Sequence, residues 1–398
     1  MRIAYIAADR GTPVFGPKGA SVHIRAMSNA LAQLGHQLVL YVAQRGSGDS
    51  PLQAEVVEVA ARMDLADAPA SGDARTVLKE RRAVDQAAQI AQRVALDHGQ
   101  HPFDLIYERY ALFSDAGVCC AERLGIPCLV EVNAPLLEEQ GTHRRLVNHA
   151  LASQVRERVF RHADALLPVS DALFAYALEQ GADPARVHVI ANGIDPHLFH
   201  PQAAPLALPQ LAGKRVIGFS GSLKPWHGLD ILLDAFRDIA VGYPERHLLI
   251  VGEGPLRGWI EGYAAGAGIS AQVTVTGWVP LEQVAGYLRC MELAVAPYPP
   301  SDDFYFSPLK LFEYLATGTA VIASRIGQIE TSLRDGVDAL LVRPGDRQQL
   351  AEAMVRLLGQ PQLRRQLGLA AAQTGSERTW PNNARRVMAI ANPLLQVA

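Results

Sequence analysis

Short apolar runs alternate with longer helical patterns along all 398 residues of this chain, and the alternation forms two series. Strands that are each followed by a helix build parallel sheets with helices on their faces. The first series predicts strands over residues 2–8, 37–43, 105–107, 127–132, 165–168 and 187–190, and the second over 216–219, 247–251, 273–276, 293–296, 320–323 and 339–342. The sequence therefore predicts an α/β protein with two doubly wound domains.

A break separates the two series. Residues 197–209 contain three prolines and several small residues, a composition typical of a linker between domains. We therefore predict one domain over residues 1–200 and a second over 201–380. Ligands of doubly wound sheets bind at the carboxyl ends of the strands, so we expect a site in the cleft between the domains.

The helical patterns are interrupted at one place in the first domain. Residues 46–73 show weak periodicity and are rich in Ala, Asp and Ser, which predicts an irregular segment. Helices are predicted over residues 20–34, 75–98, 111–124, 144–162 and 171–180, and in the second domain over 229–241, 255–266, 281–290, 308–317, 328–334 and 347–359.

Composition excludes several classes of protein. The 37 basic and 40 acidic side chains nearly balance, which does not predict a nucleic-acid partner. The four cysteines form no CxxC pair and no zinc-like spacing with histidine, so we expect buried thiols in a reducing compartment. No apolar run approaches the ~18 residues that a membrane span needs. The sequence predicts a cytoplasmic location.

A peripheral contact with the inner membrane surface stays open as an interpretation. Basic residues gather in two predicted helices of the first domain, where solvated helix faces are the simpler explanation. These residues are Arg144, Arg145, Arg156, Arg158 and Arg161 in one helix, and Lys79, Arg81 and Arg82 in the other.

Three glycine-containing loops follow predicted strands and could hold a diphosphate. G-P-K-G-A-S-V-H at residues 16–23 opens a helix, whose first N–H groups are free to bind an anion near Gly19. G-F-S-G-S-L-K-P-W-H-G at 218–228 takes the equivalent place in the second series and adds Lys224 and His227 as candidate cations. G-E-G-P at 252–255 is a third such turn. Each loop alone also fits a plain strand-to-helix connection.

The stretch D-D-F-Y-F-S-P-L-K-L-F-E at residues 302–313 is the most informative. Ser307 is a predicted N-cap, with Pro308 at the first helical position. Lys310 then lies in the first turn, which is unfavourable for a cation unless an anion binds there too. Glu313 follows in the next turn. The alternative is an ordinary i,i+3 pair on an exposed helix face.

Taken in order, these loops resemble the family-4 retaining glycosyltransferases, which belong to glycosyltransferase group 1 and have the GT-B fold. The resemblance covers nearly the whole chain and includes V-I-A-N-G-I-D at 189–195, V-G-E-G-P-L-R at 251–257, G-W-V-P at 277–280 and S-P-L-K-L-F-E-Y-L-A-T-G at 307–318. It implies two Rossmann-like domains facing a central cleft. The first would bind the acceptor and the second the nucleotide sugar, and a C-terminal helix over 381–398 would cross back onto the first.

The resemblance also implies roles for individual residues. Glu313 matches the glutamate that holds the ribose hydroxyls of the nucleotide, and it is assigned to catalysis together with Lys224, Lys310 and Asn133. His23 and Glu131 are assigned to the acceptor. The implied donor-binding residues are Gly19, Ala20, Gly221, Ser222, His227, Glu253, Gly254, Trp278, Val279, Tyr305, Phe306, Ser307 and Leu309.

The chain departs from the family pattern at three places. Tyr305 stands where the first Glu of the frequent Glu-x7-Glu motif would be. Ser222 and His227 replace an Arg and a Lys, so we expect Lys224 and Lys310 to supply the missing charge and to point toward the phosphates. Asn133 stands where many members carry a His; an amide can hydrogen-bond a sugar hydroxyl but cannot titrate.

The reaction implied by the resemblance is transfer of a sugar from a UDP- or GDP-sugar to a hydroxyl of a glycan, a lipid-linked or a small-molecule acceptor, with retention. The leaving phosphate would take the acceptor proton, and the protein would supply positioning and charge stabilisation. Asp302-Asp303 is not an Asp-x-Asp motif, so neither metal nor cofactor is expected. Two alternatives stay open: a non-hydrolysing sugar-nucleotide epimerase that uses His23, Glu131 and His227, and a catalytically inactive sugar-nucleotide-binding module.

Overall fold

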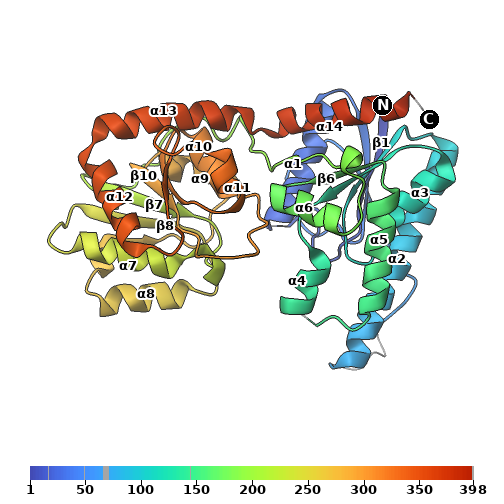
Figure 1. Cartoon of the computed structure of the whole chain (residues 1–398), viewed down its shortest axis with the longest axis horizontal. Coiled ribbons are helices and arrows are strands. Elements are labelled where there is room, and N and C mark those ends of the chain that lie inside the picture. The colour runs from blue at the N-terminus through green and yellow to red at the C-terminus, as the bar shows by residue number, and fades with distance from the viewer. Residues whose placement is uncertain (17, 49, 66–70, 144, 397–398) are drawn as a thin grey trace. The chain divides into compact units, whose positions relative to one another are not determined.

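The computed structural model describes residues 1–16, 18–48, 50–65, 71–143 and 145–396. The chain forms two compact units, one of Met1–Asn192 with Trp380–Ala398 and the other of Gly193–Thr379 (Figure 1). The divisions lie at 192/193 and 379/380, where the sequence predicts 200/201 and 380/381. Ile194 forms a bridge with Thr379, and its N–H donates to the Arg378 carbonyl over 2.9 Å. The two ends of the second unit are therefore paired with each other.

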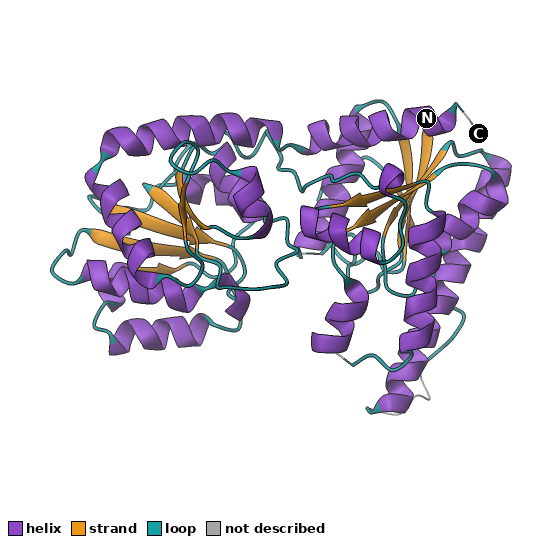
Figure 2. Ribbon diagram, in the orientation of Figure 1, coloured by secondary structure: helices purple, strands orange, loops and turns teal. Residues whose placement is uncertain are grey.

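The first unit has a parallel sheet in the order β3-β2-β1-β4-β5-β6 within the described residues. Its strands are nearly all buried because helices cover a parallel sheet on both faces (Figure 2). The bounds are β1 (Arg2–Ala7), β2 (Gln37–Val42), β3 (Glu55–Glu58), β4 (Leu105–Arg109), β5 (Cys128–Val132) and β6 (Ala165–Pro168).

The helices of the first unit are α1 (Gly19–Gln33), α2 (Asp73–Gln100), α3 (Ala116–Leu124), α4 (Leu136–His143), α5 (His149–His162), α6 (Asp171–Glu179) and α14 (Trp380–Leu395), with a short 3-10 helix η1 (Pro184–Arg186). Two predicted helices begin later than expected, at Ala116 instead of 111 and at His149 instead of 144. Residue 144 lies outside the described residues. The sequence pattern missed α4, which is short and carries two acidic residues in its first turn.

Two predictions in the first unit are wrong, one of an irregular segment and one of a strand. The segment predicted to be irregular contains β3, an edge strand that pairs with β2 and whose two valines are only half-buried, so its apolar pattern is weak; residues 49 and 66–70 of that segment lie outside the described residues. The predicted strand over 187–190 is an extended segment with one isolated bridge, from Val187 to Leu166. Its N–H groups donate to carbonyls of β6, at His188 and Ile190, without a full ladder.

The second unit has a parallel sheet in the order β12-β11-β10-β7-β8-β9 among the described residues. Its strands are β7 (Arg215–Ser220), β8 (Arg246–Val251), β9 (Val273–Val275), β10 (Leu293–Ala296), β11 (Ala320–Ser324) and β12 (Leu340–Val342). Its helices are α7 (Leu229–Ala240), α8 (Arg257–Gly266), α9 (Leu281–Leu288), α10 (Leu309–Ala316), α11 (Gly327–Ser332), α12 (Arg347–Gly359) and α13 (Pro361–Glu377), with the 3-10 helices η2 (Pro209–Leu211), η3 (Pro225–His227) and η4 (Ser270–Gln272). Two α/β units of this kind confirm the predicted fold class.

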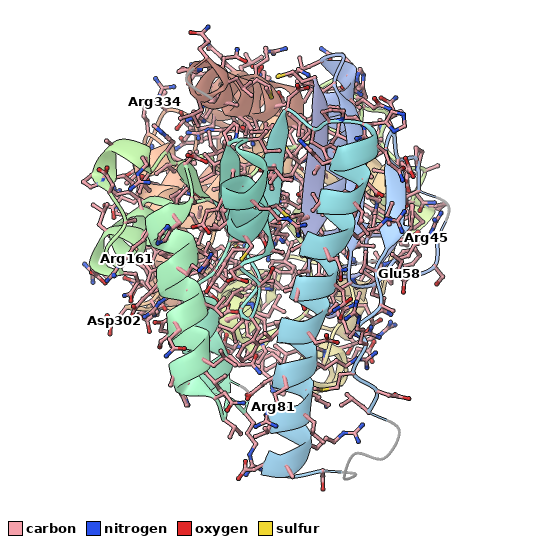
Figure 3. All side chains as sticks on the ribbon, turned by 90° about the vertical axis from the view of Figure 1, so that its right-hand side faces the viewer. Arg45, Glu58, Arg81, Arg161, Asp302 and Arg334 are labelled. Atoms are coloured by element: carbon pink, nitrogen blue, oxygen red, sulfur yellow. The ribbon has the colours of Figure 1, made fainter. Side chains whose placement is uncertain are left out.

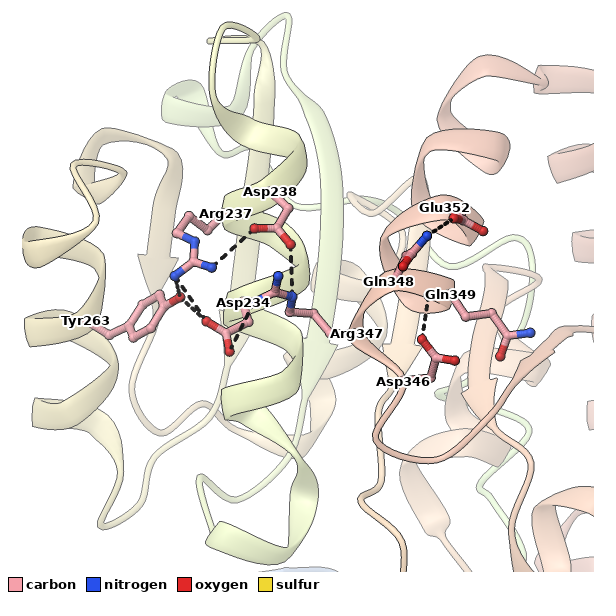
Figure 4. Close-up of polar contacts among 9 residues, drawn as sticks. All are labelled: Asp234, Arg237, Asp238, Tyr263, Asp346, Arg347, Gln348, Gln349 and Glu352. Carbon is pink, nitrogen blue, oxygen red and sulfur yellow. Dashed lines mark hydrogen bonds and ion pairs between the residues drawn. The ribbon is translucent and has the colours of Figure 1, made fainter.

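Polar contacts on the outside of α7 connect it to its neighbours (Figure 4). Arg237 donates to the Tyr263 hydroxyl of α8 over 2.9 Å, and Arg347 of α12 pairs with Asp238 at 3.0 Å. The Asp346 side chain accepts from the Gln349 N–H over 2.9 Å and caps α12. The opposite face of α7 lies in the core of the unit, with Leu232, Leu233 and Phe236 fully buried.

The strand order places the candidate residues near the carboxyl ends of the strands. In each sheet the chain changes direction at the first strand, because β1 lies between β2 and β4, and β7 lies between β8 and β10. Ligands of open α/β sheets bind outside the carboxyl ends of the strands at such a switch point. The loops after β1, β5, β7 and β10, together with the helices α1 and α10 that follow two of them, carry most of the predicted site residues. No described helix combines the length and the apolar character that a membrane crossing requires.

Candidate active site

Two glycine turns pack against each other at the carboxyl edge of the second sheet. Gly221 follows β7 with φ 138° and Gly252 follows β8 with φ 148°, a region that L side chains rarely adopt. A Cβ on Gly252 would lie 2.0 Å from the Gly221 carbonyl oxygen. Hydrogen bonds from Gly221 N–H to the Val251 carbonyl and from Leu223 N–H to the Glu253 carbonyl fix the two turns together. The loops predicted to hold the donor are therefore adjacent in the structure.

Lys310 lies directly beside the Gly221 turn. A Cβ on Gly221 would lie 3.0 Å from Lys310 Nζ, and Nζ is 4.3 Å from the centroid of the Phe219 ring and 5.5 Å from that of Tyr298. The side chain is buried, and Nζ has no hydrogen-bond partner in the described part of the chain. Burial lowers the pKa of Lys310 to about 7, and Glu313 offsets part of that shift.

Glu313 is half-buried one turn further along α10. Burial raises the pKa of its carboxyl to about 7, while the charge of Lys310 acts in the opposite direction. The alternative of an i,i+3 pair on an exposed face is wrong, because Lys310 is buried. The helix itself begins one residue later than predicted: Pro308 occupies the N-cap position and Leu309 is the first helical residue, so Ser307 is not the N-cap. Ser307 is buried just ahead of that turn.

His227 is half-buried at the end of η3, and it is not the cation expected from the sequence. Its Nδ1 lies 2.6 Å from the Ser222 carbonyl oxygen, which can only accept, so Nδ1 carries the proton. Burial lowers the pKa of His227 to about 3, with further contributions from the charges of Lys310 and Lys224. At neutral pH the imidazole is therefore uncharged, and its Nε2 is an acceptor.

Lys224 stands at the N-cap position of η3, half-buried, with Nζ 5.7 Å from the centroid of the Trp226 ring. Lys224 belongs to the loop that contains Gly221, and Lys310 Nζ lies beside Gly221, so the two cations lie near the same loop. They differ in burial: Lys310 is enclosed, whereas Lys224 lies beside a tryptophan that is itself 51% exposed. That both lysines reach the phosphates of a donor stays a prediction.

The other predicted donor residues surround these two turns. Glu253 is exposed and pairs with Arg257 at 2.7 Å, and Trp278 after β9 is 66% exposed. Tyr305 and Phe306 continue an aromatic row after β10, in which ring centroids lie 4.4 to 5.5 Å apart from Tyr298 through Phe304 to Phe306 and Tyr305. Val279 and Leu309 are half-buried. An exposed tryptophan next to backbone turns is suited to stack against a planar ring.

In the first unit, Gly19 and Ala20 begin α1, directly after the loop that follows β1. Pro17 of the loop motif lies outside the described residues. The first turn of α1 has no acidic residue, and among the described residues no side chain caps it, so its N–H groups remain available to an anion. Arg25 holds the preceding loop by donating to the Gly16 carbonyl over 3.2 Å.

A buried carboxylate organises the rest of the first unit's carboxyl edge. Glu131 Oε2 lies 2.7 Å from His23 Nε2 and accepts from the Tyr107 hydroxyl over 2.7 Å. Its Oε1 accepts from Arg109 Nη1 over 2.7 Å and from the side-chain amide of Asn133. Burial alone would raise the pKa of Glu131, but the charge and hydrogen bond of His23, together with Arg109 and Asn133, hold it well below its usual range. Glu131 is thus an anion with all its acceptor positions in use.

This geometry assigns Glu131 to these partners rather than to direct contact with an acceptor hydroxyl. His23 is also buried, and its ring packs on that of Trp380, the first residue of α14, at 4.5 Å. Sequence reasoning missed Tyr107 and Arg109. The strand period indicates only that Tyr107 and Arg109 share a face, and the register of the structure is needed to place Arg109 opposite Glu131.

Three of the basic residues suspected of membrane contact pair with acidic side chains. Arg156 pairs with Glu138 at 3.1 Å, and Arg158 with Asp115 and Glu122 at 3.2 and 2.6 Å. Arg145 pairs with Asp73, and Arg144 lies outside the described residues. Arg81 on α2 and Arg161 on α5 are exposed (Figure 3). The membrane contact stays a prediction. In the described ranges, no three His, Cys, Asp or Glu side chains gather as a metal site would require.

Comparison with known proteins agrees with this architecture. Residues 18–193 match the model of the family described as glycosyl transferase 4-like domain, and residues 214–360 match that of glycosyl transferases group 1. The two matches correspond to the two structural units. Relatives named D-inositol 3-phosphate glycosyltransferase occur in Segniliparus rotundus, at 27% identity over 93% of this chain and 83% of the relative, and in Corynebacterium urealyticum, at 28% over 98% and 94%.

Solved structures share the fold. Sucrose-phosphate synthase from Thermosynechococcus elongatus superimposes with a TM-score of 0.72 at 19% identity, over 100% of both chains. Anabaena Alr3699/HepE in complex with UDP and glucose does so with a TM-score of 0.69 at 17% identity, over 99% of both chains. The two family matches and the paired α/β units together show that this chain belongs to the family-4, group 1 glycosyltransferases and is a glycosyltransferase of the GT-B fold.

Proposed function

We propose that this glycosyltransferase transfers a sugar, with retention, from a UDP-sugar to an acceptor hydroxyl, and that Lys310 and the glycine turn at Gly221 bind the diphosphate. The observation that carries the proposal is the buried Nζ of Lys310, which has no hydrogen-bond partner among the described residues. A buried cation without a partner is unfavourable, and it is kept in proteins where a ligand supplies the missing charge.

The surroundings of Lys310 suit a diphosphate. Gly221 lets Lys310 Nζ lie close against the backbone of the turn, and Phe219 and Tyr298 give the ammonium an apolar, electron-rich wall. Bond cleavage adds negative charge to the leaving phosphate, and a preorganised cation in a low-dielectric site stabilises that charge strongly. Lys224 would add a second cation at the more exposed side. His227, being neutral, would contribute a hydrogen bond and no charge.

The candidate residues also suit a reaction without a dedicated protein base. Asn133 cannot titrate, and Glu131 is held by its own partners. We therefore infer that the leaving phosphate takes the proton of the acceptor hydroxyl on the same face of the sugar, which gives retention, and that catalysis rests on positioning and charge with no metal.

The identity of the nucleotide and of the acceptor follows from similarity only. Anabaena Alr3699/HepE has been solved with UDP and with UDP-glucose, which supports uridine as the base. Several relatives are named for D-inositol 3-phosphate, so a phosphorylated polyol is the first acceptor to examine, followed by glycan and lipid-linked hydroxyls.

The proposal is tested by measuring the melting temperature of the protein with UDP, GDP, ADP and dTDP. A ligand that binds only the folded state stabilises it by mass action, and UDP should give the largest increase. The matched variants are Lys310→Ala and Lys214→Ala; Lys214 lies at the opposite edge of the sheet and donates to the Pro244 carbonyl. Loss of the UDP effect in Lys310→Ala alone supports the proposal, and an equal UDP effect in both variants refutes it.

The reaction itself needs a second measurement. With a UDP-sugar and D-inositol 3-phosphate, free UDP should appear only when acceptor is present, and NMR of the product should show the anomeric configuration of the donor. Release of UDP without acceptor would indicate a hydrolase, and an inverted product would exclude the proposed mechanism.

A further inference from the structure

We propose that Glu131 is a positioning residue that fixes the side-chain amide of Asn133, so that Oδ1 of Asn133 is the atom offered to a substrate hydroxyl. This inference rests on the proposed function, because the hydroxyl belongs to the donor sugar or the acceptor of the same reaction. Glu131 acts through Asn133 and does not itself touch the substrate.

Glu131 is fixed in one orientation and is ionised. The carboxylate is 3% exposed, and donors lie on both of its oxygens: His23 and Tyr107 at Oε2, Arg109 and Asn133 at Oε1. These donors come from α1, from β4 and from the residue that follows β5. A carboxylate held from several elements cannot rotate, and the positive partners keep it ionised.

The side-chain amide of Asn133 can face Glu131 in only one orientation. An ionised carboxylate can only accept hydrogen bonds, so the group of Asn133 that faces it must be the NH2. The flipped amide would place Oδ1 against Oε1, with two acceptors in contact. Chemistry therefore decides an orientation that atomic positions alone often leave ambiguous. Asn133 is half-buried and lies one residue past the end of β5, at the carboxyl edge where ligands of such sheets bind.

The orientation of the Asn133 amide decides which substrate group it can recognise. With its NH2 directed at Glu131, Asn133 presents Oδ1 away from the buried carboxylate. A carbonyl-type oxygen accepts a hydrogen bond, so the matching substrate group is a hydroxyl that donates. Replacing that hydroxyl by hydrogen or by fluorine should be equally harmful, because neither can donate.

The experiment compares kcat/KM for monodeoxy and monodeoxyfluoro analogues of the donor sugar and of the acceptor. In the native enzyme, one position should lose about five- to tenfold with both analogues, as expected for one lost hydrogen bond. Glu131→Ala removes the acceptor that orients the Asn133 amide, which can then turn its NH2 toward the substrate. Because fluorine accepts a hydrogen bond weakly and hydrogen cannot accept one, the two analogues should then lose activity by unequal factors, whereas in Asn133→Ala both losses should disappear.

Glu108→Ala is the matched control. Glu108 is also a fully buried carboxyl in the first unit, on the adjacent strand β4, but it accepts from Ser114 and Gly117 and does not contact Asn133. It should keep the native pattern of losses. A Glu131→Ala enzyme that keeps the native pattern would overturn the proposal, and so would a native enzyme without a position that is equally sensitive to both analogues.

A second measurement does not depend on activity or on the folding of the Glu131 variant. In the native full-length protein labelled with 15N-asparagine, the side-chain NH2 signal of Asn133, identified by its loss in Asn133→Ala, should be protected from exchange with water. An unprotected signal would overturn the inference. Because this readout needs no donor, it separates failure of the positioning role from failure of the proposed UDP-sugar reaction.

Discussion

Two buried charges, one in each unit, are in opposite states. Glu131 of the first unit is an anion with donors on both oxygens, whereas Lys310 of the second unit has an Nζ without a hydrogen-bond partner in the part of the chain that the structure describes. Both lie at the carboxyl edge of a doubly wound sheet with the same topology. The difference indicates that the first charge belongs to the finished scaffold and that the second awaits a ligand.

Removing these two charges should change the stability of the protein in different ways. Removing one member of a buried, satisfied charge network leaves its partners uncompensated and destabilises the fold. Replacing a buried charge that has no hydrogen-bond partner by an apolar side chain of similar volume removes its desolvation penalty without leaving a cavity, and should not destabilise the empty protein. The same kind of substitution is therefore expected to act on stability in one unit and on catalysis in the other.

The largest expected effect is on the stability of the first unit. Glu131→Ala should lower the free energy of unfolding by about 3–5 kcal/mol, because His23, Tyr107 and Arg109 would lose their shared acceptor. Urea unfolding followed by circular dichroism measures the change. Glu122→Ala, which breaks an exposed pair with Arg158, should cost at most about 1 kcal/mol. A similar small change in both variants would show that the Glu131 network is not what stabilises this edge.

The next effect is on catalysis. Lys310→Ala should lower kcat/KM by about 2–4 kcal/mol of transition-state stabilisation, or about 30- to 1000-fold, as for other preorganised electrostatic donors. The melting temperature of free Lys310→Met, which fills the same space without the charge, should not fall. Steady-state kinetics with the donor varied gives the answer, and unchanged kcat/KM would remove Lys310 from the reaction.

Glu313→Ala should have a smaller effect on the same reaction. We expect a higher donor KM and a lower kcat, together worth about 1.5–3 kcal/mol, the range for hydrogen bonds to charged groups. The fold should remain intact, because Glu313 is only half-buried. A variant that melts far below the native protein yet keeps full specific activity would show that Glu313 is structural.

The smallest effect on activity is expected for Glu108→Gln, within about twofold of native kcat/KM, since the residue accepts only from Ser114 and Gly117. Its signature is in the pH dependence of stability. Burial raises the pKa of Glu108 from 4.5 to about 7. The native protein therefore loses free energy of unfolding as pH rises from about 4.5 to 7, because the buried carboxyl gives up its proton at a higher pH than in the unfolded chain. Glu108→Gln should lack that loss. Identical pH dependence of the melting temperature in both proteins would contradict the assignment.

The sequence predicted the elements whose signal is local. The alternation of apolar runs, the glycines at 221 and 252 and the cations at 224 and 310 are all visible along the chain, and the loops that carry them are adjacent in the structure. β3 was missed because an edge strand with half-buried valines has little apolar contrast. α4 was missed because it is short and polar at its start.

Charge states could not be predicted from the sequence, because they depend on burial and on partners from distant segments. His227 reads as a cation beside a glycine turn, yet its enclosure near Lys310 keeps it neutral. Glu131 reads as a free carboxylate at the end of a strand, yet donors from α1 and β4 use both of its oxygens. Arg109 and Tyr107 became site residues only once the strand register was known.

The most direct test of the central claim, that Lys310 awaits the donor diphosphate, is the melting temperature of Lys310→Met with and without UDP at a series of pH values. Burial lowers the pKa of Lys310 from 10.5 to about 7, so the native protein gains stability as pH rises from about 7 toward 10.5. The empty variant should therefore melt above the native protein, most clearly below pH 7, and the gap should close as pH rises. UDP should raise the melting temperature of the native protein and leave that of Lys310→Met nearly unchanged. An empty variant that melts lower than the native protein and responds fully to UDP would contradict the account.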